Sequence, residues 1–125
     1  MPSLDAFGIV CADIAKSVKF YNLLGLEFPD AGDDHIEATA KNGMRVMLDK
    51  LELIKQIDKD WVTPVGRPMG LAFRCDSPKE VDATYAKVTK AGFRGKTEPF
   101  DAFWGQRYAT VFDPDGNAVD LFAQL

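Results

Sequence analysis

Two segments of the chain share one order of apolar and polar positions. FGIVCADIAKSVKFYNLLGLEF (residues 7–28) and LAFRCDSPKEVDATYAKVTKAGFRG (residues 71–95) each pass from an alternating run, through a polar start, into apolar positions at helical spacing. Alternation is typical of strands, and a spacing of three to four residues is typical of helices. The pattern therefore predicts one module used twice, in which a strand, a helix and a further strand follow one another.

The ends of both predicted helices carry capping residues. Asp13 stands where a cap of the first helix belongs, and Ser77, Pro78 and Glu80 have the spacing of a capping box in the second. A glycine suited to a left-handed stop ends each helix, at positions 25 and 92. The expected buried face of the first helix consists of Ile14, Val18, Tyr21 and Leu24.

Short alternating runs complete each half. HIEATA (35–40) and MRVMLD (44–49) follow the first helix, and RYATVF (107–112) and AVDLFA (118–123) follow the second, with turns at KNG (41–43) and DPDG (113–116). We predict an α+β fold of two β-α-β-β-β modules, at about residues 1–62 and 63–125 of one domain. Residues 49–68 connect the modules, and a helical stretch is expected at 51–57.

Alternation assigns the strand residues to two faces. The bulky positions share the face expected under the helices, and the opposite, open face is small or polar. The polar and aromatic residues expected on the open face include His35, Glu37, Asp49, Tyr108, Thr110 and Asp120. A concave sheet lined in this way is a pocket for a mostly apolar ligand with a few polar groups.

The composition of the chain argues against some classes of binding partner. The 125 residues carry a formal net charge of −4, which argues against nucleic acid and against an anionic membrane. No apolar run reaches the roughly 18 residues of a spanning helix, and no signal-peptide pattern opens the chain, so we expect a cytoplasmic protein. Cys11 and Cys75 are expected to be buried and unpaired.

The paired modules and the ending DPDGNAVDLF resemble the vicinal-oxygen-chelate superfamily, which includes glyoxalase I, extradiol dioxygenases and bleomycin-resistance proteins. WGQRYATVFDPDGNAVDLF (104–122) and DKDW (58–61) are most similar to its mitomycin-binding, drug-sequestering members. The resemblance implies a curved mixed sheet with an open concave face. It also implies a homodimer whose cavities are built from both chains.

The superfamily's enzymes usually hold a divalent ion at four positions of the open face. By resemblance these positions fall on Ala6, Met47, Gly70 and Asp120, and three of the four side chains are unsuited to a hard or borderline cation. We therefore expect neither a metal nor another cofactor. A displaced set of His35, Glu37 and Asp120 is the alternative.

The closing hairpin carries the expected binding chemistry. Trp104 and Tyr108 offer stacking surfaces for a planar ring, and Gln106 offers a hydrogen bond. Phe100 and Phe103 are expected in the core, Arg107 on the helix side, and the carboxylates are expected to favour a cationic ligand. The complete set of expected ligand-binding residues is His35, Met47, Asp49, Trp61, Trp104, Gln106, Tyr108 and Asp120.

Three functions follow from these observations. The first is metal-independent sequestration of an aromatic drug or antibiotic. The second is a glyoxalase-like lyase or isomerase with a displaced or absent metal site, and the third is a structural or regulatory module without a ligand. No nucleophile lies at a recognisable spacing from the single histidine, so no catalytic residue is predicted.

Overall fold

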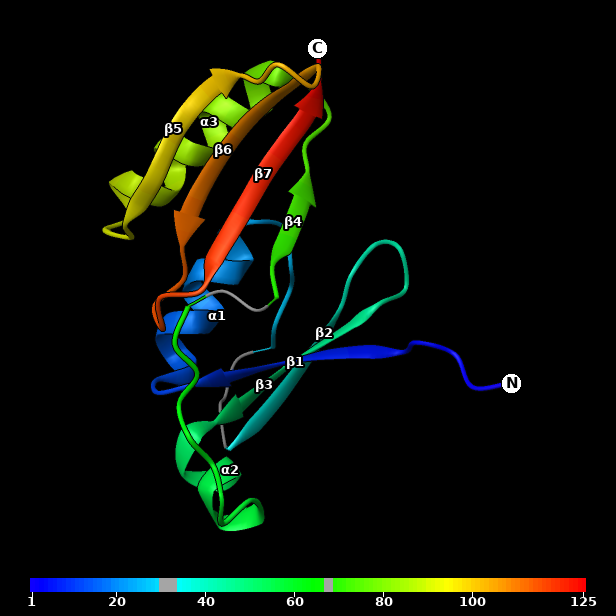
Figure 1. Cartoon of the computed structure of the whole chain (residues 1–125), viewed down its shortest axis with the longest axis vertical. Helices are drawn as coiled ribbons and strands as arrows, with labels where there is room; N and C mark the ends of the chain where they lie inside the picture. Colours follow the sequence, from blue (N-terminus) through cyan, green and yellow to red (C-terminus); the bar gives the residue numbers. More distant parts are fainter. Residues whose placement is uncertain (30–33, 67–68) are drawn as a thin grey trace. The chain divides into compact units, whose positions relative to one another are not determined.

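The computed structural model describes residues 1–29, 34–66 and 69–125. The chain divides into two compact units, Met1–Pro64 and Val65–Leu125 (Figure 1). The division falls within the predicted connector. That the two units form a single domain stays a prediction.

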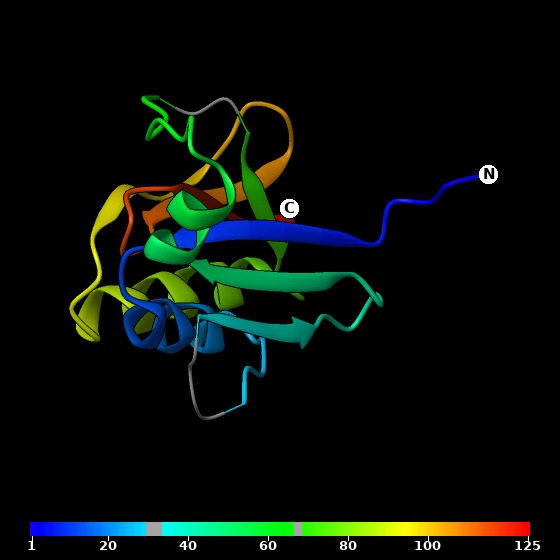
Figure 2. The same ribbon diagram turned by 90° about the horizontal axis from the view of Figure 1, so that it is seen from below.

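The first unit contains a sheet of three strands. Its elements are β1 (Ala6–Cys11), α1 (Ile14–Leu23), β2 (His35–Thr39), β3 (Arg45–Lys50) and α2 (Leu51–Ile57). The strand order is β1-β3-β2, in which β1 runs parallel to β3 and β2 runs antiparallel to it (Figure 2). The helical stretch predicted at 51–57 is confirmed by α2.

Helix α1 begins and ends as predicted, but its buried face differs. The Asp13 side chain accepts a hydrogen bond from the Lys16 backbone N–H at 3.2 Å, and Gly25 adopts the left-handed φ of 95° that follows the helix end. The buried residues are Ile14, Ser17, Phe20 and Tyr21. The prediction for Val18 and Leu24 was wrong, because both are only partly buried.

The strand predicted after α1 does not form at residues 26–28. The Leu26 backbone N–H donates to the Tyr21 carbonyl at 3.2 Å, and the Phe28 N–H donates to Oδ1 of Asn22 at 3.0 Å. These groups close the end of α1 and are not free to extend a sheet. As far as the structure describes it, the first module is therefore β-α-β-β followed by α2.

The second unit has the complete predicted order. Its elements are β4 (Leu71–Arg74), α3 (Pro78–Lys90), β5 (Gly95–Asp101), β6 (Gln106–Phe112) and β7 (Ala118–Gln124). The order in the sheet is β4-β7-β6-β5, with β4 parallel to β7 and the other pairs antiparallel. Helix α3 covers one face of this sheet (Figure 1). The predicted α+β fold class is confirmed.

The second unit also shows the predicted cap at Ser77 and the predicted placement of Arg107 on the sheet face that α3 covers. The Ser77 hydroxyl accepts the Glu80 backbone N–H at 3.2 Å. Arg107 reaches the helix side of the sheet, where its Nε donates to Oδ1 of Asp82 at 2.9 Å and its Nη1 to Oδ1 of Asp101 at 3.0 Å. The fully buried apolar side chains of this unit are Val81, Val88, Ala109, Val111, Val119 and Leu121.

Cys11 and Cys75 are both buried, as predicted, and neither forms a disulfide in the part of the chain that the structure describes. Burial raises the pKa of the Cys75 thiol, with the nearby Glu80 carboxylate adding to the effect. This thiol is therefore held in its neutral form. None of the helices in the described part of the chain has the length and hydropathy to cross a bilayer.

Candidate functional site

The open face of the second sheet centres on Asp120, which is only 8% exposed. Strand register places Thr110 and Ala72 directly beside it, one on each neighbouring strand. The Tyr108 hydroxyl donates to Oδ2 of Asp120 at 2.6 Å, and the Thr110 hydroxyl donates to Oδ1 at 2.8 Å. Both carboxylate oxygens thus accept a strong hydrogen bond from the neighbouring strand.

An aromatic cluster of Phe100, Phe103, Trp104 and Tyr108 lies at the end of this face. The Trp104 ring meets the other three edge-on, with centroid distances of 6.2 Å to Phe100, 5.0 Å to Phe103 and 5.3 Å to Tyr108. Such contacts fix ring orientations and contribute about 0.5–1.5 kcal/mol per pair beyond the buried area. The cluster is therefore an ordered surface.

The cluster is open to solvent. Trp104 is 49% exposed, Phe100 39% and Phe103 97%, so the expectation that both phenylalanines belong to the core was wrong. Strand β6 begins at Gln106, and Trp104 lies in the preceding turn. Gly105 adopts a φ of 89° in that turn, a backbone conformation that glycine adopts at little cost.

Gln106 links the turn to the strand. The Trp104 indole Nε1 donates to Oε1 of Gln106 at 2.9 Å. An indole N–H only donates, so this bond fixes which end of the Gln106 amide is the oxygen. The structure therefore brings together four predicted binding residues of the second unit: Trp104, Gln106, Tyr108 and Asp120.

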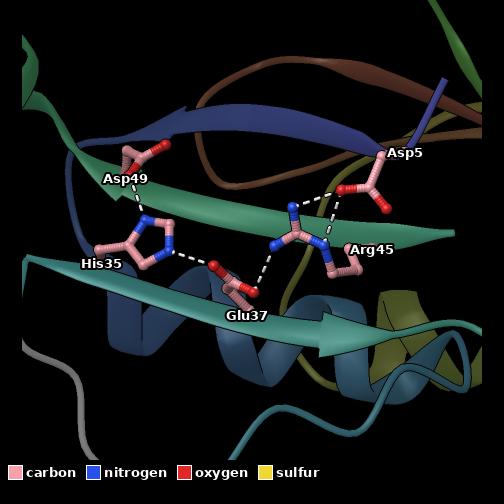
Figure 3. Close-up of polar contacts among 5 residues, drawn as sticks. All are labelled: Asp5, His35, Glu37, Arg45 and Asp49. Carbon is pink, nitrogen blue, oxygen red and sulfur yellow. Dashed lines mark hydrogen bonds and ion pairs between the residues drawn. The ribbon is translucent and has the colours of Figure 1, made fainter. Parts of the chain in front are cut away.

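The first unit carries a separate polar network on its open face (Figure 3). His35 lies between two carboxylates, with Nδ1 at 2.5 Å from Oδ1 of Asp49 and Nε2 at 2.7 Å from Oε2 of Glu37. Arg45 continues the chain of contacts, reaching Oε1 of Glu37 at 2.6 Å and Oδ2 of Asp5 at 2.6 Å. The network joins β2, β3 and the residue that precedes β1.

The contacts of the network shift the pKa values of His35, Glu37 and Arg45. A carboxylate on each side of the ring favours the protonated form of His35, in which both ring nitrogens donate. The hydrogen bonds to Asp49 and Glu37 accordingly raise the pKa of His35. The same bond to His35, followed by the bond to Arg45, lowers the pKa of Glu37. Bonds to Asp5 and Glu37 raise the pKa of Arg45.

Met47 and Asp49 lie beside Gly8 on this open face. A side-chain carbon placed on Gly8 would lie 3.7 Å from Cε of Met47 and 3.9 Å from Oδ2 of Asp49. The open face beside Gly8 is thus lined by an apolar side chain, Met47, and by a carboxyl group, Asp49. Among the predicted residues, the structure joins His35 to Asp49 and keeps Met47 near them.

Trp61, the remaining predicted residue, belongs to the first unit and is partly buried. Its Nε1 is shielded from solvent and has no hydrogen-bond partner among the described residues. A shielded indole N–H without an acceptor costs stability, and a bound acceptor would remove that cost. The role of Trp61 in ligand binding stays a prediction.

The donors observed do not suit the metal that the resemblance implies. Of its four positions, Ala6, Met47 and Gly70 offer no hard ligand, and the carboxylate of Asp120 is engaged by two hydroxyls. In the alternative set, both nitrogens of His35 are occupied by carboxylates. Within the described ranges, no group of three histidine, cysteine or acidic side chains is arranged to hold an ion.

Sequence reasoning missed two features of these surfaces. The Arg45–Asp5 pair went unnoticed because the two residues are forty positions apart and meet only through the parallel register of β1 and β3. The exposure of Phe103 was missed because hydropathy alone places a phenylalanine inside. Gly105 was the available signal, because a glycine at this point indicates a turn, and side chains in a turn are often exposed.

The fold and these open faces define a class of protein, an α+β chain of paired modules built from mixed sheets. The chain belongs to the Glyoxalase/Bleomycin resistance protein/Dioxygenase superfamily, whose family model matches residues 3–121. None of the curated proteins matches the sequence. The superfamily resemblance is thereby confirmed, whereas the nearness to mitomycin-binding members stays a prediction.

Solved structures show the same fold. A glyoxalase/bleomycin resistance protein/dioxygenase family enzyme from Burkholderia phytofirmans PsJN is 17% identical, with a TM-score of 0.86, 99% of this chain and 100% of that chain being covered. A hypothetical protein from S. aureus is 20% identical, with a TM-score of 0.83 and coverages of 98% and 94%. A glyoxalase/bleomycin resistance protein/dioxygenase from Nocardioides is 25% identical, with a TM-score of 0.77 and coverages of 100% and 85%.

Proposed function

We propose that the protein binds and sequesters a planar aromatic small molecule, of the drug or antibiotic type, without a metal ion. The observation that carries the proposal is the ordered, half-exposed aromatic cluster around Trp104. Exposed aromatic rings held edge-on against one another present flat surfaces at low entropic cost to a ligand.

The hydrogen bonds of the same face support binding over catalysis. Asp120 is buried, and Tyr108 and Thr110 each donate to one of its oxygens, so a substrate proton would have to compete with two existing hydrogen bonds. In the first unit, both ring nitrogens of His35 contact carboxylates, so neither is free to act as a base. The polar groups of both faces thus serve structure and recognition.

Two further features belong to this proposal. We infer a homodimer, because exposed apolar side chains in the second unit, Val65, Met69 and Phe103, remain to be covered. We place the protein in the cytoplasm, where buried cysteine thiols and an acidic net charge are ordinary.

Equilibrium dialysis in the presence of a chelator tests the proposed function. The panel holds a mitomycin-type quinone, a bleomycin-type glycopeptide and a glutathione hemithioacetal. We expect saturable binding of an aromatic member, which Trp104→Ala weakens about tenfold, the equivalent of about 1.4 kcal/mol. Trp104→Phe is the matched control, since it keeps a flat ring at this position.

Unchanged affinity in Trp104→Ala would remove the cluster from the binding site. Binding that is lost when chelator is added would instead favour the lyase or isomerase alternative.

A further inference from the structure

The turn between β2 and β3 contains an asparagine followed by a glycine. Its loop consists of Lys41, Asn42 and Gly43, and all three residues are exposed. The Ala40 backbone N–H closes the loop by donating to the Met44 carbonyl at 2.8 Å. Gly43 adopts the left-handed φ of 89° that three-residue hairpin loops commonly need. A side-chain carbon built on Gly43 would meet no atom within 4 Å beyond its chain neighbours. The Asn42–Gly43 peptide bond therefore lies in open space.

The side chain of Asn42 is held against the backbone that follows it. Its Oδ1 accepts the Met44 backbone N–H at 3.0 Å. A nucleophile that adds to Cγ of Asn42 places negative charge on this same oxygen, and a donor already in position stabilises that charge. The backbone nitrogen of Gly43 is the nucleophile that the chain supplies, because its addition to Cγ closes a five-membered ring. The exposed bond from the Gly43 N–H to the Ala40 carbonyl, at 2.9 Å, has to open first.

We propose that Asn42 is a site of spontaneous covalent modification in the folded protein. The Gly43 nitrogen attacks Cγ of Asn42, the bond from Cγ to Nδ2 breaks, and ammonia leaves with the proton that the Gly43 nitrogen gives up. The product is a cyclic imide. Water then opens either carbonyl of the imide, which leaves an aspartate or an isoaspartate at this position. The reaction consumes only water and is independent of the proposed small-molecule binding.

The two products differ in their effect on the hairpin. Aspartate keeps an oxygen for the Met44 N–H and adds one negative charge to a chain of formal net charge −4. Isoaspartate carries the main chain through the former side chain and lengthens the loop by one methylene. The loop directly follows the pairing of Thr39 with Arg45, so the longer loop disturbs the strand end from which Arg45 reaches Glu37.

Two other asparagines serve as internal controls. Asn22 and Asn117 are exposed, as Asn42 is, but a leucine and an alanine follow them. A side chain on the following residue hinders the closure of the imide ring, and glycine lacks one. The amide nitrogen of Asn117, which would have to leave, also donates to Oδ2 of Asp113 at 2.9 Å. Both controls should therefore react more slowly than Asn42.

Peptide mapping by mass spectrometry follows all three asparagines while the folded protein is incubated in mildly alkaline buffer. An oriented donor contributes a factor of about 100–1,000 in a buried site, and less in an exposed turn. We therefore expect Asn42 to convert about tenfold faster than either control, the equivalent of about 1.4 kcal/mol in activation free energy. An isoaspartyl methyltransferase should label the product. Asn42→Gln, which would have to close a six-membered ring, should remove the label.

The same mapping in urea gives the rate for the unfolded chain. A folded-state rate at Asn42 within about tenfold of the rate in urea supports the proposal. A slower folded-state rate overturns it, because the hydrogen bonds of the turn then protect the asparagine. Equal rates at Asn42, Asn22 and Asn117 overturn it as well, and so does methyltransferase labelling that persists in Asn42→Gln.

Discussion

Replacing His35 by glutamine should make the stability of the protein less dependent on pH. Glutamine still offers an N–H to one carboxylate, but it does not titrate. In the native protein the hydrogen bonds to Asp49 and Glu37 raise the pKa of His35 above its ordinary 6.5. A raised folded-state pKa stabilises the fold fully below 6.5, and the stabilisation is lost as pH rises through the folded-state pKa.

The expected size follows from the exposure of the pair. The side chains of His35 and Asp49 are 40% and 19% exposed, so solvent screens their 2.5 Å contact. Exposed ion pairs contribute about 0.2–1 kcal/mol, and the partial burial of Asp49 favours the upper half of that range. We therefore expect the imidazolium to contribute about 0.5–1 kcal/mol that is present near pH 5.5 and absent well above neutrality.

Urea unfolding of the native protein and His35→Gln, at about pH 5.5 and about pH 8.5, measures this contribution. The charged groups around the ring are Asp49 on β3, Glu37 on β2, Arg45 on β3 and Asp5 before β1. All four are present in both proteins, so their own titration largely cancels in the comparison. The native protein should lose about 0.5–1 kcal/mol more than the variant across this interval.

The chain has a single histidine, so an NMR titration follows its ring without overlap. An identical pH dependence in the two proteins, together with a ring that titrates at its ordinary pKa, would refute the imidazolium between two carboxylates. The contribution of Glu37 to stability has the opposite pH dependence. Its pKa is lowered, so its contribution is present above its ordinary 4.5 and lost as pH falls through the folded-state pKa.

Two predictions concern the second unit. Tyr108→Phe removes the hydroxyl that donates to Asp120 at 2.6 Å and should lower the free energy of unfolding, measured in urea, by about 1.5–3 kcal/mol. Tyr85→Phe is the control, and an equal loss of stability in the two variants would contradict the hydrogen bond. Ser77→Ala removes the cap of α3 and should cost about 1 kcal/mol by the same measurement. Ser77→Asp should retain most of that stability, and equal stability of Ser77→Ala and the native protein would contradict the cap.

Much of the fold was predictable because it depends on local signals. Alternation separated the faces of β2, β3 and β6, and side-chain caps marked the start of α1 and α3. The buried face of α1 was misplaced because hydropathy treats Ser17 as a surface residue, whereas a small side chain suits a fully buried position. The prediction of a strand at 26–28 was wrong because N–H groups of this segment bond to the end of α1. The alternation of apolar and polar residues does not reveal such bonds.

The candidate sites were predictable as sets of residues, but their bonds were not. Tyr108 and Asp120 were expected on one face, yet their hydrogen bond depends on the register of β6 against β7. The orientation of Gln106 depends on Trp104 lying in a turn, where its indole N–H meets the amide oxygen. Pairings of this kind are set by tertiary register, which composition and periodicity leave open.

The irregular edge of the second sheet limits aggregation next to the exposed aromatic cluster. Strand β5 lies at that edge, contains Pro99, and pairs with β6 through two breaks in register. Proline, bulges and the charged Lys96 and Glu98 prevent a second chain from adding to an edge. The strand that carries Phe100 is therefore a poor template for fibril growth, even though its hairpin exposes aromatic rings.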